Sequence, residues 1–162
     1  IVKGELLDLA NILSGGKGQQ CSNEFYSSPN NLLMPKPGIN MGDGWETRRR
    51  RNQENDWCII KLGIPGDIRK VMVDTSHFKG NYPDYCTLEG ASARDDSIDP
   101  ESITWKTIIG ATSLQPDREH IFVGPELASQ KEIFTHVRFN IFPDGGVSRL
   151  RVIGAPAWDI LT

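Results

Sequence analysis

Hydrophobic and polar residues alternate with a period of two along several short runs of the chain. The clearest runs are 56–63, where Cys58, Ile60 and Leu62 share one face, and 135–142. Successive side chains of a β-strand point to opposite faces, so this alternation predicts strands that are buried on one side. Weaker runs predict further strands at 18–22, 68–73, 85–89, 103–109, 120–123 and 147–153.

Helical spacing is scarce. Residues 5–13 have the spacing of one short helix or of a turn-rich lead-in, and 126–131 of a brief helical turn at most. The chain also contains 16 glycines and 10 prolines, which break regular structure between the runs. Many short strands joined by turns, in a chain of 162 residues, predict one all-β domain with antiparallel sheets.

A turn signal at 65–67 separates the run 56–63 from the run 68–73. A strand, a short turn and a second strand favour an antiparallel pair, although the sequence alone does not determine the pairing. We therefore expect these two runs to be neighbours joined by a turn.

The segment 135–153 has the strongest hairpin signal, because Asp144-Gly145 lies between two alternating runs. Pairing residue 142 with residue 147 sets Phe139 against Leu150 and Val137 against Val152, which is a coherent core face. On the polar face this register sets Arg138 against Arg151 and Asn140 against Arg149. Like charges in such positions repel. Either an anion or an acidic side chain offsets this repulsion, or the long side chains point away from each other into water.

Charge and apolar content restrict the classes of partner. The net charge is -3, so no strong nucleic-acid or membrane footprint is expected. The sequence shows neither an apolar run long enough to span a bilayer nor a visible signal peptide. The chain begins at Ile1, which fits a processed chain or a piece of a longer one.

The three cysteines, Cys21, Cys58 and Cys86, are odd in number and form no CxxC pair. We expect free, partly buried thiols in a reducing compartment. The three histidines lack metalloprotease spacing, and the chain has no GxSxG, P-loop or GxGxxG motif.

Two stretches concentrate chemically active side chains. In 42–51, Trp45 and Glu46 precede four consecutive arginines, whose guanidinium groups match carboxylates. In 74–84, a carboxylate, two hydroxyls, an imidazole, an ammonium and a carboxamide follow a predicted strand end. A solvated basic segment and a hydrophilic turn are the alternatives. We expect the two stretches to lie together, and to form one pocket with the polar face of the final hairpin, because the arginines need acidic partners or an anion.

Four long motifs resemble those of allantoicase, also called allantoate amidinohydrolase: DGWETRRRR (43–51), DW-IIKLG (56–63), VDTSHFKGNYPD (73–84) and THVRFNIFPDGGVSRLR (135–151). The resemblance covers residues 8–154 and implies hydrolysis of allantoate to ureidoglycolate and urea in the degradation of purines and allantoin. It also implies two tandem β-sandwich repeats of jelly-roll or galactose-binding type. This chain carries one copy of each motif and resembles the second repeat. We therefore expect residues 1–162 to be one repeat, the C-terminal half of a two-repeat enzyme, which alone need not be active.

The resemblance marks positions, and side-chain chemistry suggests their roles. Proton transfer is assigned to Glu46, Asp74 and His77. Substrate binding is assigned to Trp45, Arg48, Lys79, Asn81, Arg138 and Arg149, with the arginines on the substrate carboxylate and Lys79 and Asn81 on the ureido carbonyl.

The cofactor is left open by the sequence. No metal ligand is assigned, although Asp74, His77 and Glu46 together have the chemistry for a divalent metal. The expected partners are allantoate, the other repeat and further copies in a homo-oligomer, in a cytoplasmic or peroxisomal intracellular enzyme. The rival interpretations are a sugar- or anion-binding β-sandwich module, and a structural repeat without an active site of its own.

Overall fold

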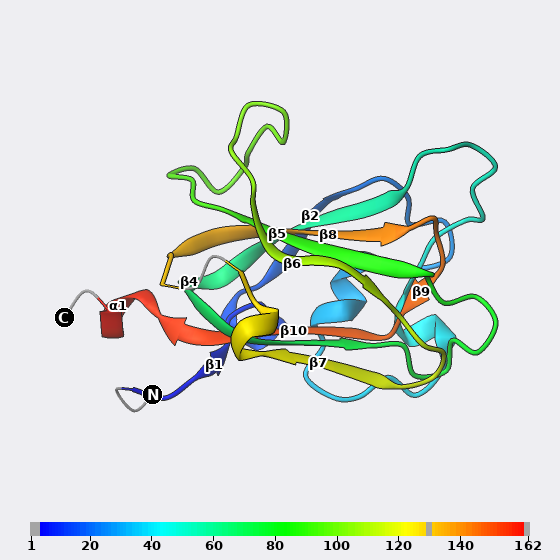
Figure 1. Ribbon diagram of the computed structural model, residues 1–162, viewed down its shortest axis with the longest axis horizontal. Helices are drawn as coiled ribbons and strands as arrows, with labels where there is room; N and C mark the ends of the chain where they lie inside the picture. Colours follow the sequence, from blue (N-terminus) through cyan, green and yellow to red (C-terminus); the bar gives the residue numbers. More distant parts are fainter. Residues whose placement is uncertain (1–3, 129–130, 161–162) are drawn as a thin grey trace.

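The computed structural model describes residues 4–128 and 131–160 and shows two antiparallel β-layers packed face to face (Figure 1). The strands are β1 (Leu7–Asp8), β2 (Lys17–Cys21), β3 (Trp45–Glu46), β4 (Asp56–Asp74), β5 (Tyr85–Ala91), β6 (Lys106–Ser113), β7 (Glu119–Val123), β8 (Phe134–Phe142), β9 (Gly146–Val147) and β10 (Arg149–Pro156). Short 3₁₀ turns lie at Ile12–Ser14, Pro29–Leu33, Met41–Asp43 and Gly124–Glu126, and α1 spans Ala157–Ile160. The predicted antiparallel β-sandwich is confirmed.

Strand β4 belongs to both layers. Its first part, up to Lys61, pairs with β2 and β8, and β8 continues the layer through β5 and β6. Its second part, from Gly66, pairs with β10 and β7, and β1 extends that layer beyond β10. A single strand of 19 residues therefore carries the chain from one layer into the other.

The predicted turn at 65–67 is wrong for this reason. The chain does not reverse there, and the ladder to β8 shifts register between Lys61 and Gly66. A Cβ at Gly63 would overlap the backbone of Ser14, and one at Gly66 would overlap the carbonyl of Ala155. Glycine lets the neighbouring backbones close around the bend, so the strand bends and continues.

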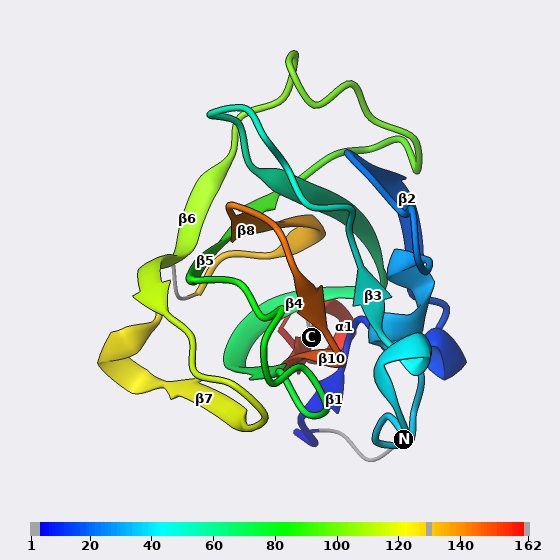
Figure 2. The same ribbon diagram turned by 90° about the vertical axis from the view of Figure 1, so that its right-hand side faces the viewer.

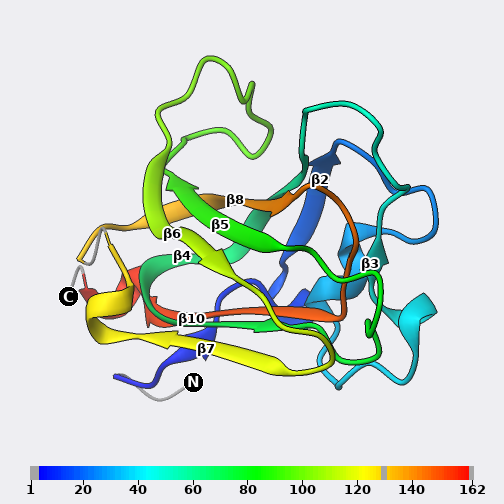
Figure 3. The same ribbon diagram turned by 45° about the vertical axis from the view of Figure 1, so that its right-hand side comes forward.

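The predicted final hairpin is also wrong. Strand β8 pairs with β4 and β5, whereas β10 pairs with β4 and β1, so the two strands lie in different layers. The segment after β8 crosses between the layers at one end of the sandwich (Figure 3), and β9 within it pairs with β3. Arg138 consequently lies opposite Glu89, and Arg149 opposite Asp74, so neither the predicted Arg138–Arg151 pair nor the predicted Asn140–Arg149 pair forms.

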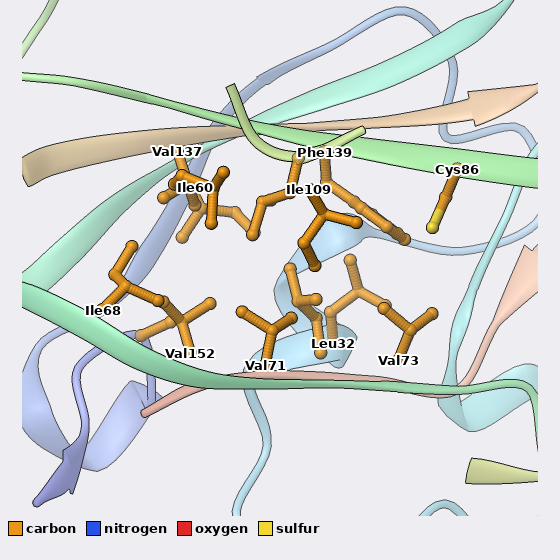
Figure 4. Packing of buried hydrophobic residues seen from close by; sticks show 14 of the residues in the cluster. Leu32, Ile60, Ile68, Val71, Val73, Cys86, Ile109, Val137, Phe139 and Val152 are labelled. Atoms are coloured by element: carbon orange, nitrogen blue, oxygen red, sulfur yellow. The ribbon is translucent and has the colours of Figure 1, made fainter. Parts of the chain in front are cut away.

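The core lies between the two layers and contains every residue that the alternation placed there (Figure 4). The exposed fraction is at most 1% for Cys58, Ile60, Leu62, Val137, Phe139, Leu150 and Val152. The face assignments succeeded although two pairings failed, because alternation reports which side of a strand is buried whichever strand lies beside it.

The smaller elements differ in detail. The lead-in contains β1 and a 3₁₀ turn, in agreement with the turn-rich alternative. The strand expected at 103–109 begins only at Lys106. The helical turn expected at 126–131 falls partly outside the described residues, and the turn that is described ends at Glu126. Cys21, Cys58 and Cys86 are free, as predicted. No helix in the described part of the chain is both long and apolar enough to cross a membrane.

The bend in β4 leads to a prediction. Gly66→Ala is expected to lower the free energy of unfolding by about 1–3 kcal/mol, because the added methyl must displace the Ala155 backbone and the Leu9 side chain. Gly110→Ala in β6 is the matched control: nothing lies within 4 Å of its Cβ position, so the change should stay within about 0.5 kcal/mol. Urea unfolding of both variants tests this, and an equal effect would mean that Gly66 is not needed for the bend.

Candidate functional site

A cavity of about 560 Å³ opens at the end of the sandwich where the segments 46–49, 80–84 and 143–145 meet, and Tyr26 adds to its lining. Figure 2 views this end, with β3 beside the segment that follows β8 and the loop that follows β4. The lining residues are Tyr26, Glu46, Thr47, Arg49, Gly80, Asn81, Tyr82, Asp84, Pro143, Asp144 and Gly145. Two of these segments are the chemically dense stretches, so the prediction that they lie close together is confirmed.

Backbone contacts join the three segments. The Thr47 amide donates to the carbonyl of Gly145 at 3.0 Å, and the Gly145 amide donates to the Thr47 hydroxyl at 3.1 Å. The Gly146 amide donates to the carbonyl of Asn81 at 2.8 Å. Gly145 has φ 127°, and a Cβ there would lie 2.7 Å from the same Asn81 oxygen, so the turn requires glycine. The walls of the cavity are therefore set by main-chain geometry.

Glu46 and Asn81 face each other in this cavity. The Asn81 amide donates a hydrogen bond to the Glu46 carboxylate. Burial raises the pKa of Glu46, and the hydrogen bond from Asn81 opposes part of that rise. These two predicted site residues are therefore brought together, in the geometry of a carboxylate positioned by an amide.

Arg49 is the cation among the residues that line the cavity, and it was not among the site residues predicted from the sequence. Its side chain is exposed and has no ion-pair or hydrogen-bond partner among residues 4–128 and 131–160. Its neighbour Arg50 is held, because its Nη1 donates to Asp56 at 2.7 Å and its Nη2 to Glu54 at 2.8 Å. In an extended segment, residues 49 and 50 point to opposite faces. Only the position of Asp56 shows which of the two arginines faces the protein.

Asp144 was also missed. Its carboxylate accepts the backbone amide of Arg50 at 2.8 Å, which fixes the arginine segment against the turn after β8. From the sequence, residues 143–146 were interpreted only as a hairpin turn, although they lie inside the motif of residues 135–151. Asp84 also lines the cavity. The residues that line the cavity thus include three carboxylates, Glu46, Asp84 and Asp144, and the Arg49 guanidinium, which lacks a partner among the described residues.

Asp74 and His77 do not line the cavity, in contrast to their predicted role in proton transfer. Asp74 is 3% exposed and accepts the amide of Ser76 at 2.8 Å, so it stabilises the loop that leaves β4. The His77 imidazole lies 2.7 Å from the carbonyl oxygen of Gly38 through Nε2. The structure therefore gives both side chains contacts outside the cavity.

Trp45, Arg48 and Lys79 are also outside it. Trp45 is fully buried, and its indole nitrogen donates to the carbonyl of Asn23 at 2.9 Å. Its side chain therefore anchors β3 to the rest of the protein. The Arg48 guanidinium lies 5.4 Å from the centre of the Phe25 ring. Lys79 is exposed and does not line the cavity.

The predicted contribution of the polar face of β8 and β10 to this pocket is wrong. Arg138 donates to Glu89 at 2.9 Å and stacks over Trp105 on the outer face of the sheet. Arg149 is 2% exposed, and its guanidinium donates to the carbonyls of Lys36, Asn31, Asp43 and Ser148 and to the Asp43 carboxylate. Neither arginine has a guanidinium that faces the cavity.

The sequence did not decide whether a divalent metal binds, and the structure shows no cluster of metal ligands among the described residues. Within 4–128 and 131–160, no group of three or more His, Cys, Asp or Glu side chains is arranged to hold a metal ion. Asp74, His77 and Glu46, the ligand set considered, are held by separate local contacts.

The environment of Glu46 leads to a titration prediction. Asn81→Ala removes the hydrogen bond that favours the ionised carboxylate, so the pKa of Glu46 is expected to rise further. Glu46 should then contribute stability that is complete below its unfolded pKa and lost as pH rises through its raised folded pKa. Carboxyl-selective NMR titration measures the shift. Gly80→Ala, in the same loop with nothing within 4 Å of its Cβ position, should leave the titration unchanged; an unmoved midpoint in Asn81→Ala would contradict the hydrogen bond.

Comparison with known proteins gives consistent results. Residues 7–157 match the family model described as the allantoicase repeat. A probable allantoicase from Pseudomonas fluorescens is 49% identical over 156 residues, which are 94% of this chain and 46% of the relative. The crystal structure of allantoicase from Saccharomyces cerevisiae superposes with a TM-score of 0.81 at 37% identity, over 95% of this chain and 45% of that one.

The fold is shared more widely than the family. The family 32 carbohydrate-binding module of C. perfringens NanJ, determined in complex with galactose, has a TM-score of 0.63 at 8% identity over 92% of this chain and 99% of that one. This likeness concerns the fold alone, that of a galactose-binding-like β-sandwich. The chain spans about half the length of the allantoicases that it matches, at 46% of one and 45% of the other.

Proposed function

The chain belongs to the allantoicase family, and we propose that it is one repeat of an enzyme that hydrolyses allantoate to ureidoglycolate and urea. The observation that carries this proposal is the cavity at the end of the sandwich, lined both by Arg49, which has no protein partner in the described part of the chain, and by Glu46, which Asn81 positions. The other repeat of the enzyme and further copies of the chain are the proposed partners. Reduced cysteines fit an intracellular enzyme, cytoplasmic or peroxisomal.

Arg49 is the proposed binding group for the substrate carboxylate. Allantoate carries one carboxylate and two ureido groups, and a guanidinium can hold a carboxylate through two parallel hydrogen bonds. Among the four arginines of residues 48–51, Arg49 alone both lines the cavity and lacks a protein partner in the described part of the chain. Arg49 therefore takes the role of binding the substrate carboxylate, which the sequence had suggested for Arg48, Arg138 and Arg149.

Glu46 is the proposed proton-transfer group. Hydrolysis requires that a water molecule lose a proton as it attacks and that the departing urea nitrogen gain one. A carboxyl group whose pKa is raised by burial can accept the first proton and return it to the leaving group. The side-chain amide of Asn81 orients the Glu46 carboxylate through its nitrogen. The side-chain oxygen of Asn81 can accept an N–H of the ureido group.

The cavity is open and polar, so the rest of the substrate is expected to meet residues from outside this chain, in the other repeat or in a neighbouring copy. One repeat alone is then inactive, as expected for half of a two-repeat enzyme, although it contributes groups of its own to the site. The proposal therefore separates the groups that this repeat supplies, Arg49, Glu46 and Asn81, from the complete active site.

Urea release from allantoate tests the proposal. The purified chain is assayed alone and after mixing with the N-terminal half of a homologous allantoicase, and binding of allantoate is measured by calorimetry. Turnover in either preparation supports the proposed function, and turnover only in the mixture assigns part of the site to the other repeat. Binding of galactose or of inorganic anions, with no allantoate binding or turnover, would favour the binding-module interpretation.

A further inference from the structure

Cys21 and Cys58 lie directly opposite each other on the paired strands β2 and β4. The next hydrogen bond along the ladder runs from the Ser22 amide to the carbonyl of Trp57 at 2.9 Å. In an antiparallel ladder this bond makes Ser22 and Trp57 the hydrogen-bonded pair and places the two cysteines at a non-hydrogen-bonded position. Both thiols contact the core between the layers, so they also lie on the same face.

The spacing at such a position suits a disulfide. Directly opposite residues at a non-hydrogen-bonded position have Cα atoms about 4.5 Å apart and Cβ atoms about 4.5–5.5 Å apart. A disulfide needs Cα atoms about 4.4–6.8 Å apart and Cβ atoms about 3.5–4.5 Å apart. The Cα spacing is therefore already right, and the Cβ atoms need to approach by no more than about 1 Å.

The two thiols differ in their access to solvent. Cys21 is partly exposed and lines a cavity of about 700 Å³, together with Gln19, Gln20, Glu24 and Asn30. Cys58 is fully buried behind it. A small polar disulfide can thus reach Cys21 through a cavity lined with hydrogen-bonding groups, whereas Cys58 can be reached only by Cys21.

We propose that Cys21 and Cys58 form a thiol–disulfide exchange site that takes small, polar peptide disulfides such as glutathione disulfide. The Cys21 thiolate attacks one sulfur of the reagent, forms a mixed disulfide and expels one peptide thiolate. The Cys58 thiolate then attacks Cys21 Sγ, forms the Cys21–Cys58 bond and expels the second peptide thiolate. Two protein thiols are oxidised, one reagent disulfide is reduced, and each expelled thiolate takes up one of the two protons released.

The reaction is slow at neutral pH. Burial raises the pKa of both thiols, and the nearby carboxylates of Glu24 and Asp56 raise the pKa of Cys21 further. Because the thiolate is the nucleophile, the rate is expected to increase about tenfold per unit of pH between pH 7 and pH 8. This places the site among those that react under sustained oxidation and leaves the reduced form as the resting state.

The bond would enclose the segment that contributes to the candidate active site. Residues 22–57 lie between the two cysteines and include Tyr26, Glu46 and Arg49. The Ser22 hydroxyl next to Cys21 donates to the Asp56 carboxylate at 2.8 Å, which in turn accepts from Arg50 at 2.7 Å. Oxidation would therefore link β2 covalently to β4 next to the Asp56–Arg50 contact that holds the arginine segment. This consequence does not depend on whether the arginine segment binds allantoate.

Mass spectrometry of the purified chain tests this inference. The reduced chain is incubated with glutathione disulfide at about pH 9, where the thiolates are better populated. The expected product is lighter than the reduced chain by two hydrogen atoms, and its peptide map contains a Cys21–Cys58 link. The melting temperature of this product should rise by roughly 5–10 °C, because the bond restricts the unfolded chain.

Two variants make the result specific. Cys58→Ala should stop at a stable glutathione adduct on Cys21. Cys86→Ala is the matched control and should still form the Cys21–Cys58 bond, because Cys86 is elsewhere in the core and burial raises its pKa to about 12. A persistent glutathione adduct in the unaltered chain, an unreacted Cys21, or a bond to Cys86 would each overturn the proposal.

Discussion

Arg149→Ala is expected to lower the free energy of unfolding by about 3–5 kcal/mol, because alanine removes a buried guanidinium and the five hydrogen bonds that it donates. Arg149 is 2% exposed, and its guanidinium donates to four backbone carbonyls as well as to the carboxylate of Asp43. Alanine would leave the buried Ser148 carbonyl and the partly buried acceptors of Asn31, Lys36 and Asp43 without this donor. Equilibrium unfolding in urea gives the free energy directly.

The loop held by Arg149 explains why the effect should be large. The carbonyls belong in part to Asn31, Lys36 and Asp43, which surround an irregular stretch with little regular hydrogen bonding of its own. That stretch leads directly into β3, which carries Trp45 and Glu46. Arg149 therefore connects the stability of the sandwich to the position of the candidate active site.

Arg51→Ala is the control for charge. Arg51 is exposed and has no hydrogen-bond or ion-pair partner among the described residues, so its removal should change the free energy of unfolding by less than about 0.5 kcal/mol. Arg149→Lys should remain destabilising, because an ammonium cannot reproduce the planar fork of donors. A small effect of Arg149→Ala would show that the guanidinium contacts are not formed in solution, and would restore Arg149 as a candidate for substrate binding.

Glu46→Gln is expected to lower the rate of allantoate hydrolysis by about 10²–10⁴-fold, the usual contribution of a positioned proton-transfer group. Glutamine retains the shape and can still accept from Asn81, but it cannot take up a proton from water. The stability should hold or rise slightly, because burial disfavours the charged carboxylate. Steady-state measurement of urea release, together with a thermal melt, separates the two effects.

Lys79→Ala and His77→Ala are the matched comparisons for Glu46→Gln. Both residues belong to the original site assignment and neither lines the cavity. Lys79→Ala should leave the rate nearly unchanged, and His77→Ala should act mainly through the loop that its imidazole joins to Gly38. If Glu46→Gln retains full turnover while His77→Ala loses it at unchanged stability, the chemistry takes place at the His77 loop and the cavity described above is not the active site.

The core faces of the strands could be predicted because the evidence for them is local. A residue such as Phe139 is separated from its polar neighbours by the geometry of its own strand, so alternation identifies it without knowledge of any partner. The same holds for the glycines and prolines that end each run, and for the scarcity of helical spacing. These features together were enough to predict an antiparallel β-sandwich and the residues that fill it.

The pairing of the strands could not be predicted in the same way. Pro65 and Asp144-Gly145 are both good turn signals, yet the chain continues as one strand at the first and crosses between layers at the second. A turn signal reports local backbone preference, whereas the partner of a strand is chosen by contacts far away along the chain. In both cases the pairing depends on β4, because its first part pairs with β8 in one layer and its second part pairs with β10 in the other.

The candidate site divides along the same line. The sequence by itself determined which segments line the candidate site, since residues 42–51 and 74–84 concentrate charged and polar groups that a core would not tolerate. Only the tertiary structure decided that Glu46, Arg49 and Asn81 share a cavity, while Arg149 is buried in the scaffold. The reason is physical: a side chain's charge and size are properties of its residue, but whether an arginine is free for a substrate or held by carbonyl groups depends on what the rest of the chain places beside it.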